Sequence, residues 1–260
     1  MLKTIRLTVA GVLASALFAT ANAGVIRDDK SDTDWEIILT PYLWGVSMKG
    51  DSGPGGTIPV DASLGDILDA LNLALSLHTE FHRGRWAFVI DPTYLDLELD
   101  LDIPTPGNKP NVRVKTWLVE AWGAYKVTNN VEFLAGARYQ DQDIKIKSGL
   151  DAYQPPLPGL LPDSIDAGEK WVDYFAGLRL NYPLGEKWIF TGRGDIAFAG
   201  DSDSAYNVQV FFNRRFGKTM ALDLGYRYFV NDFDNGKPGL DNYVWDVKLS
   251  GPVIGYTWAF

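Results

Sequence analysis

The chain lacks cysteine and long hydrophobic runs, and each absence excludes a class of protein. Without any cysteine among its 260 residues it forms no disulfide, carries no thiolate metal ligand and has no lipid-modified amino-terminal cysteine. Its longest apolar run, Leu7 to Ala19, is shorter than the roughly 20 residues that cross a bilayer as a helix. A disulfide-stapled secreted domain and a helical membrane protein are therefore both excluded.

Positive charge is also scarce. The formal net charge is −9, and no basic segment is interleaved with aromatic residues, which argues against a nucleic-acid partner. No glycine-rich phosphate loop occurs between a strand and a helix. We expect no cofactor and no nucleic acid.

The amino terminus has the three parts of an export signal. Lys3 and Arg6 form a basic segment, Leu7 to Ala19 is apolar, and Ala21 and Ala23 give a small-x-small cleavage site. This order is typical of a secretory signal peptide. We expect residues 1–23 to be removed and residues 24–260 to form a single exported domain.

The rest of the chain alternates large apolar residues with small or polar ones. A period of two places the two sets on opposite faces of a β-strand. Ten such segments are predicted: 35–46, 72–82, 86–101, 112–127, 131–147, 171–182, 187–200, 205–216, 220–231 and 243–260. Their lengths suit strands that cross a membrane at a tilt, which takes about 9–11 residues.

The connections between these segments alternate between short and long. Short periplasmic turns and longer extracellular loops produce that rhythm in transmembrane barrels. We therefore expect an all-β, antiparallel, up-and-down transmembrane β-barrel of about ten strands. Eight or twelve strands remain open, because the faces are blurred at 35–46 and 112–118.

Two of the connections are long enough to be extracellular loops with structure of their own. They are residues 47–71, in which Ser63 or Asp61 could cap a short helix from Leu64 to Leu71, and residues 148–169. The apolar face also changes side at two places. Because proline cannot donate to a sheet ladder, we expect a bulge at Asp91-Pro92 and another at Ser250-Gly251-Pro252.

The last strand ends on alternating large residues, Tyr256, Trp258 and Phe260. This ending resembles the closing strand of bacterial outer-membrane β-barrel proteins. The resemblance to this family extends over nearly the whole chain, and it matches no characterised subfamily. The resemblance implies an outer-membrane location, with both termini in the periplasm. It also implies that these three aromatic residues form the signal that the barrel assembly machinery reads.

The inward faces of the strands are polar and charged. Charges inside a barrel of this size must pair and accept hydrogen bonds, or their desolvation is costly. The candidates for a salt-bridged network in the lumen are His78, Glu80, His82, Glu120, Glu132, Arg138, Asp173, Arg179, Arg193, Asp195, Asp223, Arg227, Asp246 and Lys248. The same residues could instead line a narrow porin-like channel.

The histidine pair adds no metal site. His78 and His82 lie four residues apart on one strand, about 13 Å, which is too far for both to bind one ion. We therefore expect a structural or surface-interaction barrel with a filled lumen; a narrow channel is the alternative, and an outer-leaflet enzyme a weaker one. The expected partners are outer-membrane lipid, lipopolysaccharide and the assembly machinery, with divalent cations at acidic loops.

Overall fold

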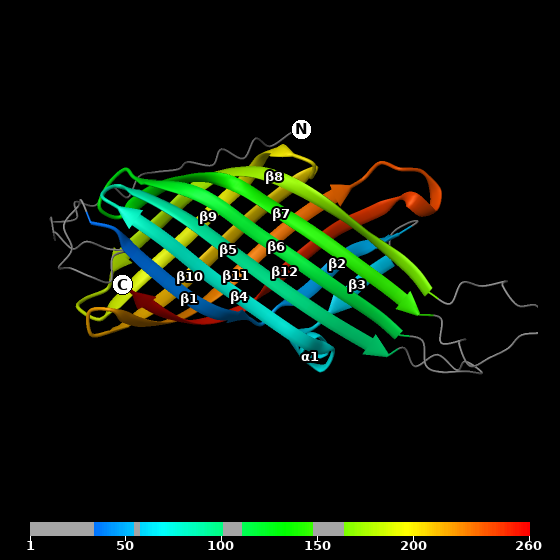
Figure 1. The fold of residues 1–260 in the computed structure, drawn as a ribbon, viewed down its shortest axis with the longest axis horizontal. Helices are drawn as coiled ribbons and strands as arrows, with labels where there is room; N and C mark the ends of the chain where they lie inside the picture. The colour runs from blue at the N-terminus through cyan, green and yellow to red at the C-terminus, as the bar shows by residue number, and fades with distance from the viewer. Residues whose placement is uncertain (1–33, 55–57, 101–110, 148–163) are drawn as a thin grey trace, which may run out of the picture.

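The ten predicted strands form a closed antiparallel barrel, and two further strands extend it on one side (Figure 1). The computed structural model describes residues 34–54, 58–100, 111–147 and 164–260. The predicted signal peptide lies outside the described residues and stays a prediction. The expectation of a ten-stranded, up-and-down transmembrane barrel is confirmed.

The described elements follow one another along the chain in a simple order. They are β1 (Glu36–Trp44), β2 (Ser47–Pro54), β3 (Ile58–Ala62), α1 (Leu64–Asp69), β4 (Leu71–Arg83), β5 (Trp86–Asp100), β6 (Asn111–Lys126), β7 (Val131–Lys147), β8 (Ser164–Pro183), β9 (Trp188–Gly200), β10 (Ser204–Phe216), β11 (Met220–Asp234), the 3-10 turn η1 (Gly239–Asp241) and β12 (Tyr243–Ala259). Strands β4 to β12 each pair with their sequence neighbours, and β1 closes the barrel by pairing with both β4 and β12.

Apolar side chains cover the outside of the barrel. Phe88, Leu178, Phe212 and Ile254 are among many large apolar residues whose exposed fraction exceeds 45%. Such a surface is stable only against lipid. Within the described residues, no helix has the length and apolar character needed to cross a bilayer.

The two ends of the barrel differ. At one end, which we name the short-turn end, residues 84–85, 127–130, 184–187 and 217–219 connect the strands. At the other, the long-loop end, the far ends of β5 to β8 lie on the same side as the β11–β12 connection (Figure 1). The predicted loop 148–169 is shorter than expected, because β8 begins at Ser164; residues 148–163 lie outside the described part.

Strand β12 has two partners on its outer side. Its carboxyl-terminal half pairs with β1, and its amino-terminal half pairs with β2. The β1–β4 ladder ends at the pair Pro41 and Leu77. From this pair toward the long-loop end, the described part of the wall has a seam between β4 and the β2–β3 hairpin. Neither strand of this hairpin was predicted; both lie within the expected loop 47–71.

Helix α1 follows the hairpin, and the prediction of a short helix at Leu64 is confirmed. Ser63 caps it: its hydroxyl accepts the Asp66 N–H, and the Asp66 carboxylate accepts the Ser63 N–H at 2.8 Å. This reciprocal arrangement satisfies donors that a helix start otherwise leaves free. Ile67 of the helix is buried against the inside of the barrel.

The expected bulge at Asp91-Pro92 is wrong. Strand β5 pairs with β6 from Trp86 to Asp100 without a shift of register. Leu95 and Leu97 therefore point inward, on the same side as Asp91, and pack with the buried apolar residues of the long-loop end. The inner surface changes from polar to apolar along the barrel axis, and this change produced the apparent switch of face.

The expected bulge at residues 250–252 is wrong for the same reason. β12 pairs with β11 in continuous register. Its alternation of buried and exposed residues runs unbroken from Tyr243 to Ala259, so Tyr243 and Trp245 lie inside. Asp246 and Lys248 are exposed on the outside, which corrects their assignment to the lumen.

Candidate functional site in the barrel lumen

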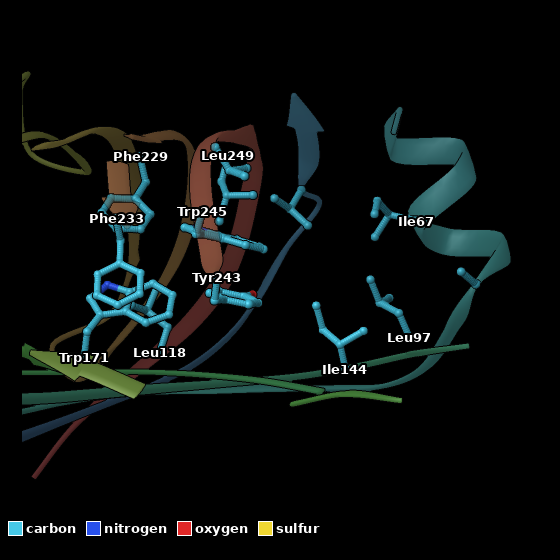
Figure 2. Close-up of a cluster of buried hydrophobic side chains, with 13 residues drawn as sticks. Ile67, Leu97, Leu118, Ile144, Trp171, Phe229, Phe233, Tyr243, Trp245 and Leu249 are labelled. Carbon is cyan, nitrogen blue, oxygen red and sulfur yellow. The ribbon is translucent and has the colours of Figure 1, made fainter. Parts of the chain in front are cut away.

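An apolar cluster fills the lumen at the long-loop end (Figure 2). Trp171 stacks on Phe233 with ring centroids 4.4 Å apart and an angle of 5° between the planes. Trp245 lies against Trp171 at 6.4 Å between centroids. These side chains come from β8, β11 and β12, so the cluster ties distant strands together across the barrel.

A charged layer lies next to this cluster, around Glu120 of β6 and Arg138 of β7. The two residues are direct cross-strand partners, and Arg138 Nε donates to Glu120 Oε1 at 2.6 Å. Arg138 Nη2 also donates to Asp195 Oδ1 at 2.7 Å. Glu120 and Arg138 have no exposed surface. Such charge-assisted bonds compensate for the loss of water around the ions.

Two further arginines complete the middle layer. Arg193 Nη1 donates to Glu120 Oε2 at 3.2 Å, and Arg227 Nη2 lies 3.3 Å from the same oxygen. Arg227 Nε donates to the side-chain oxygen of Asn207 at 3.0 Å, and the Asn207 amide donates to Asp195 at 2.9 Å. Five charged groups and Asn207, which come from five strands, thus form one connected network.

Aromatic rings hold these guanidinium groups in place. Arg138 lies between Phe175 and Phe229, with its guanidinium carbon 4.8 Å and 4.7 Å from the ring centroids. Arg193 lies 4.0 Å from the Trp122 ring. An arginine over an aromatic face gains cation–π attraction, and more so away from water.

A second ionic layer lies nearer the short-turn end. Arg179 of β8 donates to both carboxylate oxygens of Glu80, at 2.8 Å and 2.9 Å, and to Glu132. Glu80 belongs to β4, so this bidentate pair crosses the lumen. It joins residues 99 positions apart in the chain.

Both ring nitrogens of His78 face carboxylates. Nδ1 lies 2.9 Å from Asp91 and Nε2 lies 2.8 Å from Glu80. Because an ionised carboxylate only accepts hydrogen bonds, both contacts are hydrogen bonds together only when each ring nitrogen carries a proton. His82 Nε2 lies 2.8 Å from the other oxygen of Glu80. The Tyr42 hydroxyl donates to Asp91 at 2.7 Å.

The structure places twelve of the fourteen predicted network residues on the inner face; Asp246 and Lys248 are the two that lie outside. Not every one of the twelve joins an ion pair. Asp173 accepts from the Ser202 hydroxyl at 2.8 Å and from the Asn231 amide at 3.3 Å. Asp223 accepts from the Thr257 hydroxyl.

Sequence reasoning missed three members of the network: Tyr42, Asp91 and Asn207. The parity of β5 could have identified Asp91, since it continues the inward series of Ala87 and Val89. The supposed bulge hid this signal. Asn207 lies between Tyr206 and Val208, both predicted to face outward, so its inward position was readable from alternation.

The predicted assembly-signal residues lie at the short-turn end. Trp258 and Phe260 are exposed, and the rings of Tyr256 and Trp258 lie 4.6 Å apart. The backbone of Phe260 exchanges two hydrogen bonds with Ile37 of β1. The last residue therefore takes part in closing the barrel.

A cavity of about 150 Å³ lies inside the barrel, between the charged layers and the short-turn end. Trp122, Arg193 and Arg227 line it on the side of the middle layer. Asn213 and Arg215 line it close to where β10 ends. Among the described residues, no group of three or more histidine and carboxylate side chains is arranged to hold a metal ion.

The closed antiparallel wall, the apolar exterior and the ionic interior define a transmembrane β-barrel. No family model and no curated protein matches the chain. Among solved structures, it is similar to Ail, the attachment invasion locus protein of Yersinia pestis, with 11% identity, a TM-score of 0.40 and coverage of 88% of this chain and 99% of that one.

Two further solved structures are similar to the chain. The translocator domain of the autotransporter NalP from Neisseria meningitidis has 11% identity, a TM-score of 0.39 and coverage of 86% and 88% of the two chains. A FadL homologue of Pseudomonas aeruginosa has 8% identity, a TM-score of 0.38 and coverage of 87% and 90%. At this level of similarity, no binding or transport property passes from these proteins to the present chain.

Proposed function

We propose that the protein is an integral outer-membrane barrel with a closed lumen and a structural or surface-interaction role. The complete burial of Glu120 and Arg138 in the middle of the barrel carries this proposal. Ions that line a water-filled pore remain hydrated, whereas these are held by one another and by aromatic rings. The apolar cluster at the long-loop end closes the same path a second time.

In this proposal, the short-turn end faces the periplasm and the long-loop end faces the medium. The half-buried Lys115 lies in a groove with Tyr94 and Trp117 on β5 to β8, together with the exposed Lys145 and Lys170, which pair with Asp166 and Asp141. This position suits contact with the phosphate groups of lipopolysaccharide, directly or through divalent cations at the neighbouring carboxylates. The closing strand would serve as the contact for the assembly machinery.

We assign no catalytic activity to the lumen. A general base needs a lone pair within reach of a substrate. Both ring nitrogens of His78 are occupied by carboxylates. His82 is buried, with 5% of its surface exposed, and binds Glu80.

Planar-bilayer recording of the purified protein tests the closed lumen. We expect no stepwise conductance for the wild type. Arg193→Ala opens the middle layer but leaves the apolar cluster, so it too should stay silent. The combined variant Arg193→Ala/Trp245→Ala weakens both closures and should admit ions. Reproducible conductance steps in the wild type would refute the proposal.

A narrow channel is the second candidate, and the cavity favours it. Water already has room in the half of the lumen next to the short-turn end. A channel would then need only a rearrangement of the middle layer and the apolar cluster. The same recordings separate the two candidates, since a channel predicts steps in the wild type that Arg193→Ala alters.

A further inference from the structure

The cavity has a roof of hydrogen-bond donors that lack acceptors. Trp122 Nε1 and Arg193 Nε are buried and have no hydrogen-bond partner in the described part of the chain, and Arg227 Nη2 has only an ion-pair contact with Glu120 at 3.3 Å. All three residues line the cavity and have at most 5% of their surface exposed. A buried donor without an acceptor costs about 1–3 kcal/mol, so such groups are rare without a reason.

These donors lie close to one another. The guanidinium of Arg193 covers the Trp122 ring at 4.0 Å, and both Arg193 and Arg227 reach the same oxygen of Glu120, at 3.2 Å and 3.3 Å. The unpartnered N–H groups of Trp122 and Arg193 therefore belong to neighbouring side chains in one region of the cavity wall, which Arg227 also lines. A hydrogen-bond acceptor in that region would satisfy these donors.

The charge of the middle layer points to a negative acceptor. Three arginines, Arg138, Arg193 and Arg227, face only two carboxylates, Glu120 and Asp195. The layer therefore carries one positive charge more than its own acids balance. The neighbouring acid Asp91 also lines the cavity, but arginines still outnumber carboxylates on its wall: Arg179, Arg193, Arg215 and Arg227 against Glu80, Asp91 and Asp223.

The remaining walls restrict what kind of anion fits. Ile189, Phe211 and Val253 give the cavity apolar surface, which suits an organic body. Asp223 also lines it, and a second negative charge on the ligand would meet this carboxylate. A cavity of about 150 Å³ is comparable to one that holds a benzene ring.

We propose that this cavity binds a small organic monocarboxylate. Its carboxylate accepts hydrogen bonds from Trp122 and Arg193 and lies beside the positive charge of Arg227. Its apolar body lies against Phe211 and Val253. Binding at this place is independent of whether the lumen conducts.

Calorimetric titration of the full-length mature barrel in detergent micelles tests the site with four probes of similar size. Benzoate carries the required charge, benzamide is its neutral analogue, benzylamine is a cation and phthalate is a dianion. We expect benzoate to bind at least tenfold more tightly than each of the others. Equal affinity for benzoate and benzamide, or no detectable benzoate binding at 10 mM, overturns the proposal.

Two indole variants locate the site. Trp122→Phe keeps an aromatic ring but removes the pyrrole part of the indole with its N–H, so benzoate affinity should fall by roughly tenfold, the loss of one bond to a charged group. Trp245→Phe removes another buried, unpartnered N–H, in the apolar cluster away from the cavity, and should leave affinity unchanged. Equal effects of the two variants also overturn the proposal. The wild-type comparison of benzoate with benzamide decides the matter even if a variant fails to assemble.

Discussion

Replacing Glu120 by glutamine isolates the contribution of the middle layer to stability. Glutamine keeps the shape of the side chain but removes the negative charge that Arg138, Arg193 and Arg227 share. Three buried cations then face a single remaining carboxylate, Asp195. Leaving a buried charge uncompensated costs about 3–5 kcal/mol. We expect Glu120→Gln to lower the free energy of unfolding by that amount.

Urea unfolding in lipid vesicles, followed by tryptophan fluorescence, measures this change. With a slope of about 2 kcal/mol per molar urea, the midpoint should fall by roughly 1.5–2.5 M. Glu98→Gln is the matched control, because Glu98 is an exposed acid on β5 that binds the Asn72 and Asn111 amides. Its effect should stay within about 0.5 kcal/mol.

A second variant tests whether the loss is electrostatic. Arg138→Met removes the cation closest to Glu120, and in the double variant Glu120→Gln/Arg138→Met fewer charges are left unbalanced. The double variant should therefore be more stable than the sum of the two single losses predicts. If Glu120→Gln and Glu98→Gln unfold at the same urea concentration, the ionic layer does not hold the barrel together and the reasoning fails.

Three other predictions follow from the wall and its ends. A methyl group at Gly251 would clash with the Gly45 carbonyl, whereas one at Gly194 meets no atom within 4 Å. Gly251→Ala should therefore abolish the heat-modifiable migration of the folded barrel in gel electrophoresis. The control Gly194→Ala should preserve it. The hydrogen bonds from the side chain and backbone of Ser63 hold the pKa of Asp66 below its ordinary value of 3.8, so the cap stabilises α1 above that pH and is lost as the pH falls below it. Amide exchange in α1, once intrinsic exchange is subtracted, should accelerate there in the wild type. It should depend less on pH in Ser63→Ala, which keeps only the bond from the backbone N–H. Phe260→Ala should reduce the amount of assembled barrel in cells while purified protein refolds into detergent at the normal rate, and a matching refolding defect would contradict an assembly signal.

The alternation of side chains made the barrel readable from the sequence, because a strand between lipid and a filled lumen must change chemistry at every residue. The same rule failed where the lumen itself changes chemistry. Leu97 and Trp245 are large and apolar yet point inward, because an apolar cluster fills the lumen at the long-loop end. Alternation alone does not distinguish an apolar lumen from a change of face.

The partners within the lumen were less predictable than its members. Alternation placed Glu80 and Arg179 on inward faces, but their contact crosses the barrel between strands that are not neighbours. The diameter of the barrel and the stagger of its strands decide which side chains meet, and neither is encoded locally. The hairpin β2–β3 was missed because its sequence is short and rich in glycine and proline.

The seam beside α1 has a consequence for how the barrel comes apart. Only six residue pairs, Glu36 to Pro41 with His82 to Leu77, hold β1 to β4, whereas β7 and β8 share a ladder of 17. The β1–β12 ladder has five pairs, but β12 gains eight more from β2, whereas β4 has no other partner on that side in the described part of the wall, so unfolding should begin between β1 and β4. Opening there leaves β1 attached to β12 alone. It exposes the edge of β4 before any of the longer ladders yields.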